Sequence, residues 1–228
     1  AVYIKKSANA IGNPQFVMTG GRIEDCRASF NGGGIYLEGG SVEMTNGTIH
    51  NNIASDGNGG GIYIAKGDFT IKGNDAEVSN NSALHRGIAD AGNGGGIYIT
   101  SPTADVNVIV ESGNIINNSC DRNGGGVCVD VASSDNKAEV NIGTDSGGPT
   151  ILANKAILYG GGLYAIGKNA VVTIDGGSIK NNRVVNYVPN EDVANEYGTV
   201  VLNDGDVTHV VITFDANTTD PSAVVPQP

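Results

Sequence analysis

The groups in this sequence that could do chemistry are acidic side chains, three histidines and three cysteines. His50, His85 and His209 lie in different contexts, and none stands beside a cysteine at the spacing of a zinc site. Pairs of loop aspartates also lack the ligand spacing of a calcium loop: Asp56 with Asp90, and Asp204 with Asp206. We therefore predict no metal site and no cofactor.

Composition narrows the classes of partner. The chain has 228 residues, with 13 Lys and Arg against 24 Asp and Glu, which gives a net charge of −11. This acidic balance argues against nucleic acid and anionic membranes as partners. No apolar run approaches the ~18 residues of a membrane span, so we expect no membrane insertion.

An internal repeat dominates the sequence. The string Gly-Gly-Gly, followed by an aliphatic residue and usually by Tyr, begins at Gly32, Gly59, Gly94, Gly124 and Gly160. Asn31, Asn58, Asn93 and Asn123 precede four of the copies, and Tyr159 precedes the fifth. Successive triplets are about 30 residues apart. Repeats of about 30 residues indicate stacked structural units that bury a shared core.

Each copy carries three short patterns in which apolar residues alternate with polar ones, as Ile62 and Ile64 do, which is the period of a strand. One copy is long enough for a three-sided coil whose strands pair with those of the next coil. We predict an all-β, right-handed parallel β-helix of about six three-strand coils with a C-terminal partial coil or cap. The alternative is a globular β-sandwich, which the five registered glycine triplets disfavour.

The repeat predicts three parts of the chain: coils over residues 1–185, a degenerate last coil or cap over 186–217, and a Pro-containing linker or tail over 218–228. The chain begins inside a strand pattern without an initiator Met, so we expect a fragment or processed form with further coils upstream. We expect it to be monomeric or part of a longer solenoid.

A column of asparagines ends the third strand of successive copies, with Cys26 in its place in the first. Stacked amides hydrogen-bond along the coil axis and tolerate a bent backbone, so we predict a structural asparagine ladder. Its members are Asn52, Asn81, Asn118, Asn154 and Asn182. A ligand-binding row of amides is the alternative.

A second column of residues lies in the first strand of each copy. Each member stands between two aliphatic residues that face inward, as Tyr36 does between Ile35 and Leu37, so alternation points its side chain outward. Its tyrosines are candidate ligand-binding residues, since Tyr supplies contact area and a hydroxyl at low entropic cost. The alternative is stabilisation by stacking at the ~4.8 Å strand spacing. The column contains Tyr3, Tyr36, Tyr63, Tyr98, Cys128 and Tyr164.

With Gly-Gly-Gly-Ile-Tyr, the Asn-Asn corner and the three-strand period in view, residues 1 to 185 resemble the pectin-lyase-like β-helix superfamily. More narrowly, they are similar to Gly-Gly-Gly/Asn repeat proteins of bacterial cell surfaces, relatives of adhesin repeats. Val211–Asn217 separately resembles the opening of small repeats in large bacterial surface proteins. The resemblance implies an extracellular or cell-surface location.

Polysaccharide lyases and hydrolases of this superfamily cluster Asp, Arg or Lys on one strand face, and a hydrolase needs two carboxyl groups about 5–10 Å apart. The expected outward row after the tyrosines is Lys5, Glu38, Ala65, Thr100, Asp130 and Ile166. Glu38 and Asp130 are three coils apart, roughly 14 Å. We therefore expect no enzyme active site in the coils.

The leading hypothesis is a non-enzymatic adhesin or rigid stalk of a larger bacterial protein that binds a glycan or host-surface protein. One alternative is a polysaccharide lyase or hydrolase with catalytic residues in the loops 84–93, 100–107 or 130–137, or outside the chain. Another is a glycan-binding module that uses the tyrosine face.

The three cysteines do not predict a disulfide scaffold. Cys26 and Cys120 would be three coils apart, beyond the ~7 Å Cα separation that a disulfide allows. A bond between Cys120 and Cys128 stays open, and we expect free, inert thiols.

Overall fold

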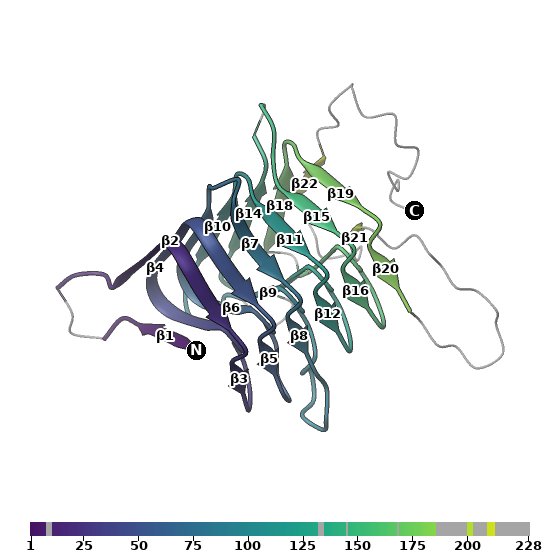
Figure 1. The fold of residues 1–228 in the computed structure, drawn as a ribbon, viewed down its shortest axis with the longest axis horizontal. Coiled ribbons are helices and arrows are strands. Elements are labelled where there is room, and N and C mark those ends of the chain that lie inside the picture. Colours follow the sequence, from purple (N-terminus) through teal and green to yellow (C-terminus); the bar gives the residue numbers. More distant parts are fainter. Residues whose placement is uncertain are drawn as a thin grey trace.

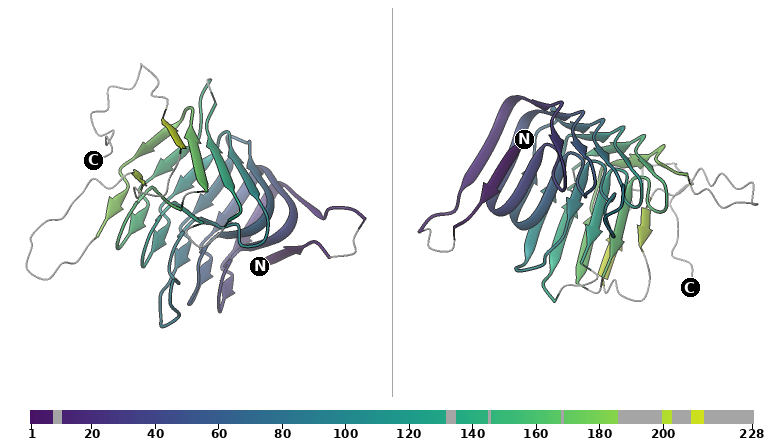
Figure 2. Two further views of the ribbon diagram at one scale, coloured as in Figure 1. Left: turned by 180° about the vertical axis from the view of Figure 1, so that it is seen from behind. Right: turned by 90° about the horizontal axis from the view of Figure 1, so that it is seen from below.

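The computed structural model describes residues 1–7, 11–131, 135–144, 146–167, 169–185, 200–202 and 209–212. Within these residues every regular element is a β-strand. Figure 1 shows the strands of successive coils lying side by side in rows from the N-terminal to the C-terminal end. Figure 2 shows the same coils stacked along one axis. The chain is an all-β parallel β-helix, as the repeat predicted.

In each coil a first strand, which follows a glycine triplet in the second to sixth coils, leads to a second strand. Separate first strands are β1 (Val2–Lys5), β9 (Ile97–Ile99), β13 (Val127–Asp130), β17 (Leu163–Ile166) and β21 (Val200–Leu202). Separate second strands are β10 (Val106–Val110), β14 (Ala138–Ile142), β18 (Ala170–Ile174) and β22 (His209–Ile212). In three places neighbouring strands merge: β2 (Gln15–Glu24), β4 (Ile35–His50) and β6 (Ile62–Ile71).

A third strand and a short fourth strand complete the coil. Separate third strands are β7 (Ala76–Ser79), β11 (Asn114–Ile116), β15 (Thr150–Leu152) and β19 (Ser178–Lys180). The fourth strands are β3 (Arg27–Ala28), β5 (Ile53–Ala54), β8 (Ser82–Ala83), β12 (Ser119–Cys120), β16 (Lys155–Ala156) and β20 (Arg183–Val184). The fourth strands form a six-stranded sheet of their own, one strand for each coil.

The prediction of three strands in each coil missed this fourth strand. It is only two residues long, too short to show an alternating pattern. Its inward positions hold small residues because little room remains beside the corner, and Ala83, Cys120 and Ala156 form a small buried cluster there.

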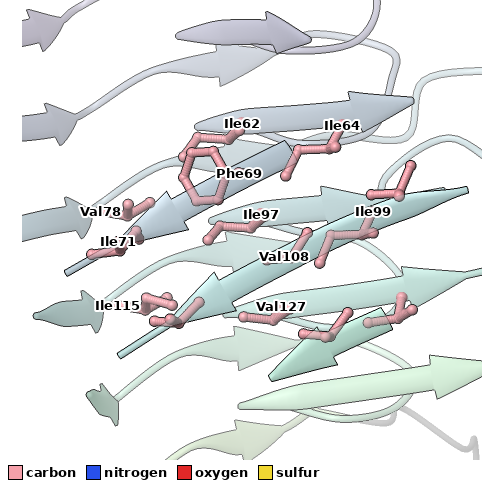
Figure 3. Close-up of a cluster of buried hydrophobic side chains, with 14 of the residues drawn as sticks. Ile62, Ile64, Phe69, Ile71, Val78, Ile97, Ile99, Val108, Ile115 and Val127 are labelled. Atoms are coloured by element: carbon pink, nitrogen blue, oxygen red, sulfur yellow. The ribbon is translucent and has the colours of Figure 1, made fainter. Parts of the chain in front are cut away.

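Coil-to-coil pairing is parallel and mostly in register, so equivalent residues stack. Ile62 pairs with Ile97, which pairs with Val127, and Phe69 pairs with Val108. Figure 3 shows these side chains, from opposite walls of neighbouring coils, pointing into one interior. The resulting apolar core runs through the coils without interruption. No single coil could bury these residues, because each needs a neighbour above and below.

The glycine triplets are required by the backbone. Gly59 has φ +68, a conformation that disfavours L side chains. A Cβ on Gly95 would lie 2.3 Å from the carbonyl oxygen of Ser119 and 2.6 Å from that of Gly125. The triplet therefore lies at a corner where a fourth strand and the next coil pack against the glycine backbone without room for a side chain.

The predicted asparagines lie in one buried column. Each Nδ2 donates to the Oδ1 of the next asparagine, and Asn81 donates to Asn118, which donates to Asn154, at 3.0 Å in both cases. The same nitrogen of Asn118 donates to the carbonyl oxygen of Val78 in the preceding coil. Asn52 and Asn182 extend the column at its two ends.

A second asparagine column precedes the glycine triplets. The backbone N–H of Asn58 donates to Asn31 Oδ1, that of Asn93 to Asn58 Oδ1, and that of Asn123 to Asn93 Oδ1. The next coil has Tyr159 at this position, and Asn123 Oδ1 is buried without a hydrogen-bond donor in the described part of the chain. The sequence showed these asparagines, but their hydrogen bonds were not predicted.

The residue before each buried asparagine adopts a left-handed backbone. Asn51, Asn80, Asn117 and Asn181 have φ between 53° and 56°, and Asp25 has φ 56°. Asn and Asp tolerate this conformation better than other non-glycine residues. Ala153 occupies the same position in the fifth coil with φ 55°. Alanine tolerates a left-handed backbone less well than Asn or Asp, so this position is strained.

The predicted C-terminal parts lie largely outside the described residues, including Phe214 and all of 218–228. Two strands beyond the sixth coil are described: β21 pairs with β17 and β22 pairs with β18, both parallel. Val200, Leu202, Val210 and Ile212 therefore lie in strands that continue the first and second rows of the coil.

Replacing Asn118 with Ala should destabilise the fold by at least about 3 kcal/mol, because the substitution leaves buried groups of Asn81 and Val78 unpaired. Denaturant unfolding followed by circular dichroism measures the change. The matched control is Asn107→Ala on the outer face of β10, which should cost less than about 1 kcal/mol. Equal losses for the two variants would contradict a structural role for the ladder.

Replacing Ala153 with Asn should stabilise the protein by about 0.5–1 kcal/mol, since Asn relieves part of the left-handed strain at an exposed position. The reciprocal change, Asn117→Ala, should destabilise it by a similar amount. Thermal unfolding of the two variants beside the parent chain measures both shifts. A lower midpoint for Ala153→Asn would show that something other than φ governs this position.

Candidate functional site

The tyrosine column is the most distinctive outward feature of the first strands. Parallel pairing aligns its members: Tyr3 with Tyr36, Tyr36 with Tyr63, and Tyr63 with Tyr98. Cys128 and then Tyr164 continue the same row. From Tyr36 onward the positions align because each first strand follows its glycine triplet at the same offset. Pairing of β1 with β4 adds Tyr3 to the row, and a shift of one residue in any strand would turn its ring inward.

Neighbouring rings of the column are in contact. The centroids of Tyr36 and Tyr63 are 4.8 Å apart with an interplanar angle of 30°, and those of Tyr63 and Tyr98 are 5.3 Å apart at 13°. Tyr3 meets Tyr36 edge to face, at 5.3 Å and 70°. Stacking covers the faces of the inner rings, whereas the ring of Tyr3 stands across the end of the stack.

The exposure predicted for the whole column is found only at its N-terminal end. Tyr3 is 59% exposed, and Tyr36 and Tyr63 are half-buried, but Tyr98 and Tyr164 are 6% and 5% exposed. These two side chains leave the coil interior, as alternation requires, and then pack with Cys128 in a second apolar cluster that Tyr63 and Ile166 also contact. Tyr98 and Tyr164 are therefore covered and do not form part of an open surface.

The hydroxyls of Tyr3 and Tyr98 differ in environment. The hydroxyl of Tyr3 donates to Glu38, which also accepts from Lys5 Nζ at 3.2 Å. Because both bonds favour the carboxylate, the pKa of Glu38 is lowered and that of Tyr3 is raised. Tyr98 donates to Asp130 at 3.1 Å, and its burial raises its pKa well above the ordinary value. Both hydroxyls thus remain neutral donors.

The expected outward position of Ala65 is wrong. A register shift after Leu37 places Lys66, and not Ala65, opposite Glu38, and Ala65 is buried. A β-bulge of this kind inserts one residue and changes the face of those that follow, which alternation alone does not predict. Lys5, Glu38 and Lys66 consequently form a row of alternating charge beside the exposed tyrosines.

Other charged groups are distributed in separate pairs. Lys72 contacts Glu43 at 2.9 Å and Lys137 contacts Glu139 at 2.8 Å, on different coils. Among the residues that the structure describes, no group of three or more His, Cys, Asp and Glu side chains is placed to hold a metal ion. The arrangement supports local ion pairing on the surface of the rod.

Asp56, Asp90 and His50 have structural partners. Asp56 accepts the backbone N–H groups of Arg86 and Ile88, which ties the loop 84–93 to the preceding coil, and Asp90 pairs with Arg122 at 3.2 Å. His50 Nδ1 lies 3.0 Å from Ser79 Oγ. Asp204, Asp206 and the side chain of His209 lie outside the described parts.

All three cysteines are free, with Cys26 half-buried and Cys120 and Cys128 buried. Burial raises the pKa of Cys120 to about 12 and that of Cys128 well above its ordinary value. Because the thiolate is the reactive form, both buried thiols should be inert in the folded protein. Cys26 occupies the first position of the buried asparagine column, where its backbone N–H donates to Asn52 Oδ1.

At mildly alkaline pH, an aromatic disulfide reagent should therefore modify Cys26 alone in the folded protein and all three thiols after unfolding. Absorbance of the released thiol counts the reactive groups. A Cys26→Ser variant serves as the control and should show no rapid reaction when folded. Rapid reaction of that variant would show that a buried thiol is accessible.

In the described residues no helix is long and apolar enough to cross a membrane. Residues 16–112 match the family model described as the right handed beta helix region, from the second strand of the first coil to the end of β10 in the fourth. Neither the curated proteins nor the solved structures gave a match to the chain. By strand order, register and this family match, the fold of the chain is a right-handed parallel β-helix.

Proposed function

We propose that the chain is a non-enzymatic extracellular module, an adhesin or rigid stalk segment of a larger bacterial surface protein, whose open tyrosine strip contacts a host-surface protein or a glycan. The strip consists of the exposed Tyr3 and the half-buried Tyr36 and Tyr63. The observation that carries the proposal is the division of one aligned column into a covered part and an open part. The open part is the end that offers aromatic surface to a partner.

The coil interior supports a role as a stiff spacer. Parallel sheets, an uninterrupted apolar core and a buried amide column all run along the rod axis, and the described strands pair with those of neighbouring coils. Bending the rod would stretch the coil-to-coil hydrogen bonds on its outer side, in several rows of strands at once. Such a body keeps a binding strip at a constant distance and orientation from its point of attachment.

The chemistry of the strip favours a polar and aromatic contact. Tyrosine combines apolar area with a hydroxyl and loses little side-chain entropy on binding, which makes it frequent in recognition surfaces. Lys5, Glu38 and Lys66 lie beside it with alternating charge. Alternating charges suit a partner that presents both donors and acceptors, as protein surfaces and glycans do.

A glycan is the second candidate because of the orientation of Tyr3. Its ring lies edge to face against Tyr36 and is the most exposed of the column, so one aromatic face remains available for the C–H groups of a sugar ring. The inner rings, which stack on one another, present mainly edges. A glycan contact would therefore involve the Tyr3 end of the strip.

The polysaccharide lyase or hydrolase remains an alternative that a direct assay separates from binding. The purified chain is incubated with uronate-rich and neutral oligosaccharides, and unsaturated or reducing products are measured. Product formation above that of a heat-denatured sample would overturn the non-enzymatic proposal. Binding without product would agree with it.

The double variant Tyr3→Ser/Tyr36→Ser should weaken partner binding by at least about tenfold, since buried aromatic anchors dominate recognition energy. It should cost only about 1–2 kcal/mol of stability, because little more than ring stacking is lost. Glycan arrays and adhesion of protein-coated beads to host cells measure binding, and denaturant unfolding measures stability.

The matched control is Tyr98→Ser, which removes a covered ring and its bond to Asp130. This variant should lose about 3 kcal/mol of stability and, at temperatures where it stays folded, should bind as the parent chain does. Unchanged binding of the Tyr3/Tyr36 double variant, at an affinity measurable for the parent, would refute the strip as the contact surface.

A further inference from the structure

The chain contains five Asn-Gly dipeptides, at residues 31–32, 46–47, 58–59, 93–94 and 123–124. In this dipeptide the backbone nitrogen of glycine can attack the side-chain carbonyl carbon of asparagine, because glycine has no side chain to hinder the approach. The attack needs a side chain folded over that nitrogen and a backbone that can rearrange. The five sites share their chemistry and differ only in their surroundings.

Four of the five dipeptides belong to the second asparagine column. Their glycine N–H groups donate to a backbone carbonyl of the next coil, as Gly59 does to Asn93 at 2.9 Å and Gly94 to Asn123 at 2.9 Å. Gly32 and Gly124 make the equivalent bonds at 3.0 and 2.9 Å. Attack by these nitrogens requires the coil-to-coil bond to open first.

Two side chains of this column, those of Asn58 and Asn93, are restrained as well. Asn58 Oδ1 accepts from both the backbone and the side-chain nitrogen of Asn93, at 2.8 and 3.1 Å. The Nδ2 of Asn93 also donates to the carbonyl oxygen of Asp90. These bonds hold the amide away from the geometry of ring closure.

Asn46 lies in a different environment. It is exposed, and it occupies the corner of β4 between the second and third strands. The N–H of Gly47 donates to Asn46 Oδ1 at 2.6 Å, so this side chain already folds over the nitrogen that would attack it. Gly47 has φ +94, which keeps the corner bent at this point.

We infer that Asn46 is a site of spontaneous deamidation in the folded protein, and that the four column asparagines are protected from it. The Gly47 nitrogen forms a bond to Asn46 Cγ and loses its proton to solvent, and the side-chain amide leaves as ammonia. Water then opens the resulting five-membered imide at either carbonyl. The products are aspartate or isoaspartate at residue 46, with water as the only co-reactant.

Modification at this position changes the first two coils. Aspartate adds a negative charge, and isoaspartate also lengthens the main chain by one carbon. Asn46 pairs with Thr19 of β2 between two register shifts, so this part of the β2–β4 pairing is already irregular. The extra carbon would therefore be accommodated locally, while the core rows on either side, Met18 with Met44 and Ile23 with Ile49, stay in register.

The test is a time course of the intact folded chain at mildly alkaline pH, followed by peptide mapping with mass spectrometry and enzymatic methylation of isoaspartate. We expect Asn46 to deamidate at least about tenfold faster than each column asparagine, because the latter react only after local opening. A parallel sample in denaturant should deamidate at all five sites at similar rates.

The Asn46→Gln variant is the matched control, since glutamine would have to close a less favourable six-membered ring. It should remove the early product and leave the rates at the four column sites unchanged. The inference is overturned if Asn46 in the folded chain survives as long as the column asparagines, or if the folded and denatured samples give the same ranking. These outcomes do not depend on the proposed surface function.

Discussion

The structure depends on hydrogen bonds that each coil can complete only with its neighbours. The buried asparagines show this most directly, because the side chain of Asn118 bonds to Val78 in the coil before and to Asn154 in the coil after. A buried amide without such partners would destabilise the fold by the full cost of desolvation. The amide column therefore favours only those arrangements in which successive coils are stacked in register, and the core and outer rows follow that register.

The register that stacks the core residues of successive coils also stacks the residues of the outer face. Once Ile62 stacks on Ile97, Tyr63 must stack on Tyr98, whether or not a partner binds there. The stacking of the tyrosines is thus a consequence of the core, and ring contact alone does not identify a binding site. What distinguishes one end of the column is exposure, since Tyr98 and Tyr164 are covered whereas Tyr3 is open.

The two asparagine environments show how the same register governs chemical reactivity. A column Asn-Gly pair such as 93–94 has its glycine N–H bonded to the next coil. At Asn46 the glycine N–H bonds to the preceding side chain. The Asn-Gly dipeptide is the same at both places, but its hydrogen bonds and its exposure to water differ. Surface corners are therefore the places where this fold is chemically least protected.

The sequence by itself determined the coil, because the glycine triplets recur with alternating strand patterns between them, and each triplet fixes the position of the first strand that follows it. It also indicated both asparagine columns, although the hydrogen bonds of the second one, through Asn58 and Asn93, were not foreseen. These features depend on local backbone geometry and on repetition, which the order of residues records directly.

Only the tertiary structure decided which outward residues are accessible. Alternation correctly sends Tyr98 out of the coil interior, but its burial in a second cluster depends on packing outside the coil. The bulge that exchanges Ala65 for Lys66 arises from the pairing of β4 with β6. The two-residue fourth strands likewise exist only through their neighbours. Exposure, bulges and short pairings are properties of contacts between coils, and no single copy of the repeat contains them.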